Sequence, residues 1–194
     1  DMLNGDVRWF ENGKLNITKN CIDRHLNKRG DKTAIIFEPN DPKEEALHIT
    51  YNELYERVCK MANVLKEQGI QKGDRVCIYL PMIPELPVAL LACARIGAIH
   101  SVVFAGFSST SLATRINDAD CKLVITSDGG FRGSKTIDLK SIVDEALESC
   151  ESVESVLVVE RTKTEVKMKE GRDHWLQPLL DQAKSDNVAE IMDA

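Results

Sequence analysis

One stretch, residues 75–107, constrains the fold of this chain more than any other. It contains two apolar, β-rich runs, residues 76–80 and 99–104, on either side of an almost wholly apolar segment, residues 88–96. Prolines separate the first run from this segment, and Gly97 follows it. Proline ends a strand and suits the first turn of a helix, whereas glycine commonly follows the last turn. The stretch therefore predicts a strand, a buried helix and a second strand.

Both runs lack the regular polar alternation of a half-exposed strand, which is typical of strands covered on both faces in a parallel sheet. Further β-rich runs at residues 123–126 and 156–159 alternate with segments whose apolar residues recur at helical spacing. From residue 75 onward, strands and helices therefore alternate. This order predicts an α/β fold: an open, mostly parallel sheet flanked by helices on both faces.

The first 50 residues predict an arm, a helix and a β-hairpin. We expect Trp9 and Phe10, in the arm, to pack onto the body of the protein. Residues 17–28 have apolar positions at helical spacing and precede a glycine. Two β-rich runs, residues 33–37 and 47–50, flank a segment of turn-forming residues, which predicts the hairpin.

The rest of the chain divides into an α/β core and a polar end. Thr50 and Glu53 have the spacing of a capping box, which predicts the start of a helix. We assign residues 51–160 to the doubly wound core. Residues 161–194 are then a polar excursion and an end that closes no obvious element. The charge-rich run at residues 160–172 is typical of a solvated loop.

Charge and composition exclude several classes of protein. Nucleic-acid-binding proteins usually have a basic face, whereas this chain has a formal net charge of -6. The longest apolar run in the central helix falls far short of the roughly 20 residues of a membrane span, and no secretory signal is evident. We therefore expect neither nucleic acid nor a membrane as partner. The 6 cysteines are scattered, which predicts free thiols in a reducing cytoplasm. No Cys, His and carboxylate cluster has metal-ligand spacing, so no metal site is predicted.

The glycine-rich segment at residues 127–136 is the clearest candidate for chemistry. It follows the predicted strand at residues 123–126, and ligands of open α/β sheets bind at such strand ends. Its glycines predict a loop whose N–H groups can approach an anion, and Arg132 and Lys135 add cations suited to phosphate. A phosphate-binding loop and an ordinary surface turn both stay open from the residues alone.

The same segment nearly matches the Walker A pattern G-x-x-x-x-G-K-[ST]. Gly129, Lys135 and Thr136 fit it, but Ser134 stands in place of the second glycine. No strand ending in a magnesium-binding aspartate is evident, so the sequence does not favour a P-loop NTPase. Asp128 suits turn formation better than it suits the orientation of a ligand.

Several short segments, spread over most of the chain in one register, resemble one enzyme family. They are W-F-x-x-G-x-L-N at residues 9–16, G-D-R-V at 73–76, Y-L-P-M-I-P-E at 79–85, A-C-A-R-I-G-A at 92–98, H-S-V-V-F at 100–104, G-F-S at 106–108 and V-I-T at 124–126. The family is that of the acetyl-coenzyme A synthetases. It belongs to the adenylate-forming superfamily, with other acyl-CoA synthetases, luciferases and peptide-synthetase adenylation domains.

The resemblance implies an AMP-forming acetate–CoA ligase. Acetate and ATP, with Mg²⁺, would give acetyl-adenylate and pyrophosphate, and the thiol of CoA would then displace AMP. The chain matches part of the large N-terminal domain of such an enzyme. The family's ATP-phosphate loop, acetate pocket and catalytic lysine have no counterpart in it. We therefore expect no complete catalytic site here, and we expect the remainder of its own chain to be a partner.

The resemblance also implies two parts of a CoA site. The segment that holds the 3′-phosphorylated adenosine matches Arg132, Gly133, Ser134 and Lys135, and a turn beside the adenine matches Phe104, Ala105 and Gly106. Ala105 and Ser134 depart from glycine, and Lys135 departs from an arginine of some relatives. Two alternatives stay open: a propionyl-CoA or other short-chain acyl-CoA synthetase, and a non-catalytic CoA- or nucleotide-binding module.

Overall fold

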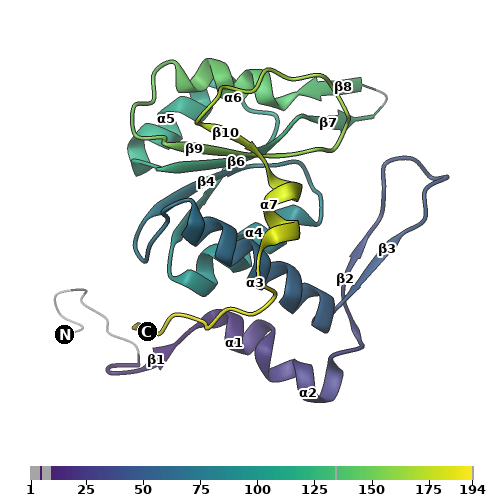
Figure 1. Cartoon of the computed structure of the whole chain (residues 1–194), viewed down its shortest axis with the longest axis vertical. Helices are drawn as coiled ribbons and strands as arrows, with labels where there is room; N and C mark the ends of the chain where they lie inside the picture. Colours follow the sequence, from purple (N-terminus) through teal and green to yellow (C-terminus); the bar gives the residue numbers. More distant parts are fainter. Residues whose placement is uncertain (1–4, 6–9, 134, 194) are drawn as a thin grey trace.

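The computed structural model describes residue 5, residues 10–133 and residues 135–193. At its centre is a five-stranded parallel sheet with strand order β10-β9-β6-β4-β5 (Figure 1). The strands are β4 (Arg75–Tyr79), β5 (Ile99–Val102), β6 (Leu123–Ser127), β9 (Ser155–Val159) and β10 (Asp173–Trp175). The predicted α/β fold with an open, mostly parallel sheet is confirmed.

Helices cover both faces of the sheet (Figure 1). They are α5 (Ser109–Ala119) and α6 (Leu139–Leu147) on one face, and α3 (Tyr51–Glu67), α4 (Glu85–Ile96) and α7 (Leu176–Gln182) on the other. In β4, Val76 and Ile78 belong to the core with α3 and α4, whereas Cys77 and Tyr79 belong to the core with α5 and α6. The three central strands, β4, β6 and β9, thus contribute alternate side chains to two cores, which explains their unbroken apolar sequences.

The β4–α4–β5 unit forms as predicted, with two differences. Helix α4 begins at Glu85, before its predicted start, because Pro87 fits within a first turn that needs no N–H donor. Gly97 follows the helix with a φ of 73°, as predicted. β5 is an edge strand, and its Ile99 and Val102 are 56% and 48% exposed. The predicted cover on both faces is therefore wrong for β5.

The predicted hairpin and capping box near residue 50 are confirmed. β2 (Thr33–Phe37) and β3 (Leu47–Thr50) pair antiparallel. At the start of α3, Thr50 donates its N–H to the Glu53 carboxylate at 2.7 Å, and the Thr50 hydroxyl accepts from the Glu53 N–H at 3.2 Å. These two bonds satisfy donors that the first turn of a helix otherwise leaves free.

The N-terminal segment differs from its prediction. The single helix predicted over residues 17–28 is instead α1 (Ile17–Cys21), the 3₁₀ turn η2 (Asp23–His25) and α2 (Leu26–Arg29). The break falls at Ile22, whose φ of -128° is not helical and whose side chain is fully buried. Phe10 is 80% exposed, so the predicted packing of the arm is wrong for this residue, and Trp9 lies outside the described residues.

The last described residues, 183–193, form a strap that the sequence does not predict. Its β11 (Met192–Asp193) pairs antiparallel with β1 (Lys14–Leu15). The guanidinium of Arg95, 2% exposed, donates to the carbonyl of Asn187 at 2.6 Å and to Asp23 at 2.9 Å. The strap is therefore fixed to the end of α4 and to the N-terminal helices by a buried cation.

The charge-rich segment before β10 is only partly solvated. β10 itself is unpredicted and adds a parallel strand beside β9. Arg172 bonds to Asp144 at 2.6 Å and to Asp173 at 2.5 Å, so the prediction of a solvated loop over residues 160–172 is wrong for this arginine. Residues beyond 160 therefore contribute to the sheet and to its packing.

The structure bears on the expectations about membrane spans, metal sites and cysteines for the residues that it describes. None of the described helices is long and apolar enough to cross a membrane. The described residues contain no group of three or more His, Cys, Asp or Glu side chains that could hold a metal ion. The cysteines are free, and all are buried except Cys21. Burial raises the pKa of Cys121 to about 11, so this thiol stays protonated at neutral pH.

Candidate functional site

A cavity of about 230 Å³ lies where turns that follow the strands of the parallel sheet meet two hairpins. The turn after β4 contributes residues 80–83, the turn after β5 contributes residues 104–106, and Arg161 follows β9. The two hairpins contribute Asn40, Gly130, Phe131, Arg132 and Ile137. Because β4, β5 and β9 are parallel, the cavity lies at the carboxyl edge of the sheet, where open α/β sheets bind ligands.

The glycine-rich segment is a β-hairpin, so the prediction of a loop over these residues is wrong. β7 (Gly129–Arg132) and β8 (Lys135–Asp138) pair antiparallel. A Cβ atom at Gly129 would lie 2.6 Å from Oγ1 of Thr162. Gly129 therefore serves the close packing of the hairpin against the segment after β9, rather than the approach of an anion to its N–H group.

Asp128 joins the base of this hairpin to the segment after β9. Its carboxylate is fully buried and accepts the N–H groups of Gly129 at 2.7 Å, Arg161 at 2.7 Å, Thr162 at 3.0 Å and Thr164 at 3.2 Å. Hydrogen bonds to a charged acceptor are about twice as strong as neutral ones. Asp128 therefore organises a turn, as its sequence context favours, and it fixes the backbone of Arg161 beside the cavity.

The cavity brings together residues from both predicted parts of the CoA site: Phe104, Ala105, Gly106 and Arg132 line it. Lys135 faces Arg132 across the hairpin. Neither Lys135 nor Gly133 is among the described residues that line the cavity. Ser134 lies outside the described residues. Arg132 of the hairpin thus lines the cavity, whereas Gly133 and Lys135 beside it do not.

The turn after β5 presents an aromatic ring to the cavity. Phe104 is 67% exposed and meets Phe107 edge to face, with ring centroids 6.1 Å apart. A Cβ atom at Gly106 would lie 2.7 Å from the Phe104 ring, so glycine lets the ring fold over its own turn. The Tyr79 hydroxyl donates to the Phe107 carbonyl at 2.8 Å, and burial raises the pKa of Tyr79. An exposed ring on a fixed turn suits stacking against a nucleobase.

Arg161, Phe131 and Asn40 are lining residues that sequence reasoning missed. The Arg161 guanidinium lies over the Phe131 ring, 5.3 Å from its centroid, and 5.6 Å from the centroid of the Phe37 ring. A signal for Arg161 existed, because it closely follows a predicted parallel strand, as the glycine-rich segment does. Asn40 and Phe131 gave no comparable signal, since long-range packing brings them here. Among the described lining residues there are two arginines and no carboxylate.

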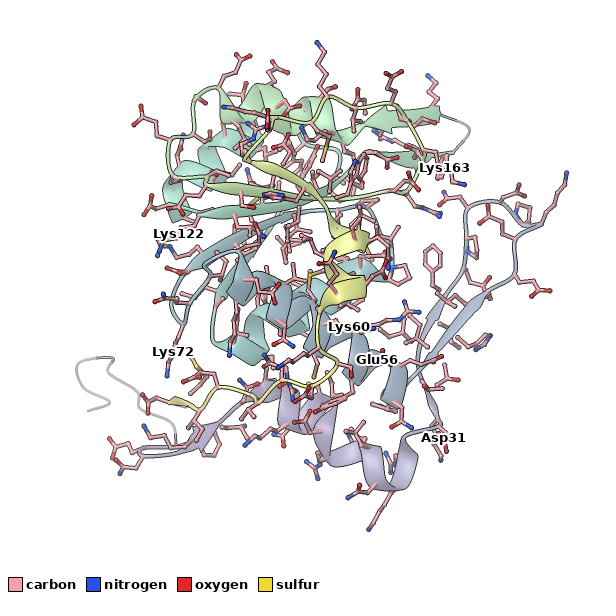
Figure 2. The ribbon with its side chains drawn as sticks, in the orientation of Figure 1. Asp31, Glu56, Lys60, Lys72, Lys122 and Lys163 are labelled. Carbon is pink, nitrogen blue, oxygen red and sulfur yellow. The ribbon has the colours of Figure 1, made fainter. Side chains whose placement is uncertain are left out.

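A second hollow, of about 370 Å³, lies between α3, α4 and α7. Its lining mixes acidic and basic side chains, including Glu56 and Lys60, which Figure 2 labels on α3. The Lys60 ammonium pairs with Glu56 at 2.9 Å. The lining includes four carboxylates, of Glu53, Glu56, Glu85 and Asp181, against the two cations of Arg57 and Lys60. This excess of negative charge disfavours an anionic ligand such as a phosphate, so this hollow is the weaker candidate.

Comparisons with known proteins agree on one family. Residues 22–192 match the family model described as AMP-binding enzyme. The acetyl-coenzyme A synthetase of Alkalilimnicola ehrlichii is 57% identical over 194 residues, and acetyl-coenzyme A synthetase 2 of Pseudomonas aeruginosa is 56% identical over 194 residues. Each comparison covers 100% of this chain and 30% of the relative, so the chain spans about 30% of the length of these relatives. Among solved structures, an acetoacetyl-CoA synthetase from Streptomyces lividans matches 95% of this chain and 28% of its own, with a TM-score of 0.84 and 28% identity.

Proposed function

Because the chain belongs to the AMP-binding enzyme family, we propose that it is the N-terminal part of an AMP-forming acetate–CoA ligase. In the first step acetate attacks the α-phosphate of ATP, which arrives with Mg²⁺, and pyrophosphate leaves. In the second step the thiol sulfur of CoA attacks the acetyl carbon. The new C–S bond replaces the C–O bond to AMP, and the thiol proton is released. The whole-protein activity is proposed because relatives between 53% and 57% identical carry the name acetyl-coenzyme A synthetase.

The proposed role of this chain is to bind the nucleotide end of CoA. The observation that carries it is the meeting of Phe104 and Arg132 at one cavity, although they lie 28 positions apart in the sequence. Phe104 offers a face for stacking the adenine, and the turn to Gly106 gives the base room at the backbone. Arg132 offers two parallel N–H donors to the 3′-phosphate.

Gly133, Ser134 and Lys135 complete the proposed CoA segment at the turn of the hairpin. Lys135 adds a point charge outside the cavity, which suits attraction of the ligand more than a fixed contact. None of these side chains takes part in bond making in the proposal. The chemical steps belong to parts of such an enzyme that have no counterpart in this sequence. We also propose that the enzyme acts in the cytoplasm.

Replacement of Arg132 tests the proposal in the full-length protein. We expect Arg132→Ala to raise KM for CoA about 10- to 100-fold, since a hydrogen bond to a charged group is worth about 1.5–3 kcal/mol. Acetate-dependent pyrophosphate exchange, which reports adenylation alone, should stay near the wild-type rate. Arg29→Ala, at an exposed arginine of α2, is the matched control. Equal loss in pyrophosphate exchange and thioester formation would contradict the assignment to CoA.

The solved acetoacetyl-CoA synthetase favours one second candidate, a ligase for another short acyl group. We prefer acetate because the relatives with that name are about twice as identical to this chain. Pyrophosphate exchange with acetate, propionate and acetoacetate in turn separates the two candidates. A non-catalytic CoA- or nucleotide-binding module would show no exchange with any of the three acids.

A further inference from the structure

Arg161 is held at both of its ends. Its N–H donates to the buried Asp128 carboxylate at 2.7 Å, which fixes the backbone. Its guanidinium lies over aromatic rings of two hairpins, 5.3 Å from the ring centroid of Phe131 in β7 and 5.6 Å from that of Phe37 in β2. Attraction between a cation and the face of an aromatic ring favours this arrangement. The guanidinium is therefore ordered before a ligand arrives, which lowers the entropy cost of binding.

Arg161 lacks the carboxylate partner that three other arginines have within the described residues. Arg75, Arg95 and Arg172 each form an ion pair with an aspartate, at distances between 2.6 and 2.9 Å. Within residues 10–133 and 135–193, no such pair involves Arg132 or Arg161. Both of these arginines line the same cavity, and no carboxylate of the described residues does. A half-buried cation without a protein counter-ion points to an anionic ligand.

We propose that Arg161 is a second phosphate-binding residue, which together with Arg132 binds the 3′-phosphate of CoA. The inference rests on the proposed CoA site. A phosphate monoester carries up to two negative charges and three terminal oxygens, so two guanidinium groups on different elements can each donate to it. Arg132 comes from a hairpin and Arg161 from the segment after β9, so they approach the cavity from separate parts of the chain.

The test compares two substrates that differ only in the phosphate. In the full-length protein, KM is measured for CoA and for 3′-dephospho-CoA with wild type and with Arg161→Met. Methionine keeps an unbranched, polarisable side chain that packs against aromatic rings without the charge. We expect KM for CoA to rise at least about 10-fold, the effect of a lost hydrogen bond to a charged group, and KM for 3′-dephospho-CoA to stay within about threefold.

Two further variants separate a binding role from a structural one. Arg161→Lys keeps the charge and loses the fork, so it should restore part of the preference for CoA. Arg115→Met is the matched control, since Arg115 also lies over an aromatic ring, at 4.8 Å from the Phe107 centroid. It bonds to Ser111 and is not among the residues that line the cavity. It should leave both KM values unchanged. Thermal unfolding of each variant identifies any that fail to fold.

Three results would overturn the inference. The first is an equal rise in KM for both substrates with Arg161→Met, which indicates a general loss of structure. The second is no rise for either. The third is a rise in KM for ATP in pyrophosphate exchange, which assigns the cation to another phosphate. If Arg132→Ala still impairs CoA use selectively, the proposed function survives any of these results. If Arg132→Ala has no such effect, the proposed site itself fails.

Discussion

Cations gather at two places beside the sheet, and the two places differ in how their charge is balanced. Beside α6 and β10, Lys140 and Arg172 face Asp144 and Asp173, so two positive charges meet two negative charges. The Lys140 ammonium lies 2.7 Å from Asp144 and 2.8 Å from Asp173, and it also donates to a backbone carbonyl at 3.0 Å. In the cavity, Arg132 and Arg161 both line the wall, and no carboxylate is among the described lining residues.

The difference separates a structural cluster from a candidate binding site. Lys140 and Asp173 are 1% and 0% exposed in their side chains, so their charges are stable only together. Burial alone would raise the pKa of Asp173, but hydrogen bonds from Arg172 and Lys140 lower this pKa below its ordinary value. The cluster has its partners already. The cavity has no such partner among the described lining residues, as expected of a site for an anion.

Loss of one partner from the balanced cluster should have the largest effect on stability. We expect Asp173→Asn to lower the free energy of unfolding by about 3–5 kcal/mol, the usual cost of removing one partner of a buried ion pair, since two cations then share the single carboxylate of Asp144. Urea denaturation measures the change. Asp118→Asn, at an exposed position of α5, is the control and should change it by less than about 0.5 kcal/mol. A loss as small as the control's would mean that water reaches Lys140 and that the cluster is not a structural element.

The pH dependence of stability should be smaller and should depend on the same aspartate. The unfolded chain takes up a proton near the ordinary pKa of 3.8, whereas folded Asp173 keeps its charge to lower pH. Its contribution is therefore complete above pH 3.8 and is lost as the pH falls through the lower pKa of the folded state. Denaturation at a series of pH values should show a shallower decline in this range for Asp173→Asn than for wild type.

Some acid sensitivity should remain in that variant. A hydrogen bond from Lys122, which Figure 2 labels, also lowers the pKa of Asp74. The two groups lie 2.8 Å apart in a partly exposed pair. Equal slopes for wild type and Asp173→Asn below pH 4 would contradict the role given to Asp173.

The comparison also explains what the sequence could predict of the fold. The β4–α4–β5 unit was accessible because periodicity, prolines and Gly97 act locally. β10 was not, since Asp173, His174 and Trp175 have no apolar run. Its position depends on pairing with β9 and on the ion cluster, which join residues far apart in sequence. The run at residues 160–172 was predicted to be solvated for the same reason. The sequence shows the charge of each residue but not which residue forms an ion pair with it.

Arg132 and Phe104, predicted from the resemblance to belong to one site, line the same cavity. The glycines of the hairpin predict N–H groups that are free to bind an anion. Gly129 instead packs closely against Thr162. Arg161 was overlooked although it closely follows a predicted parallel strand, because its approach to Phe131 and Phe37 depends on the fold. The resemblance supplied which segments are expected to bind CoA. It did not supply which side chains hold those segments in place.

The smallest predicted effect concerns a cation at the edge of the cavity. Lys135 is exposed, lies opposite Arg132 on the hairpin and is not among the described lining residues. We expect Lys135→Met in the full-length protein to raise KM for CoA less than about fivefold, because an exposed charge interaction is worth about 1 kcal/mol or less. The effect should shrink as salt is added, since exposed charges are screened over about 8–10 Å at physiological ionic strength. Lys66→Met, at an exposed lysine of α3, controls for the loss of one charge. A rise in KM for CoA as large as that of Arg132→Ala, and insensitive to salt, would contradict this expectation. It would mean that the turn of the hairpin contacts the phosphate directly, so that Lys135 adds its charge to the cavity on binding.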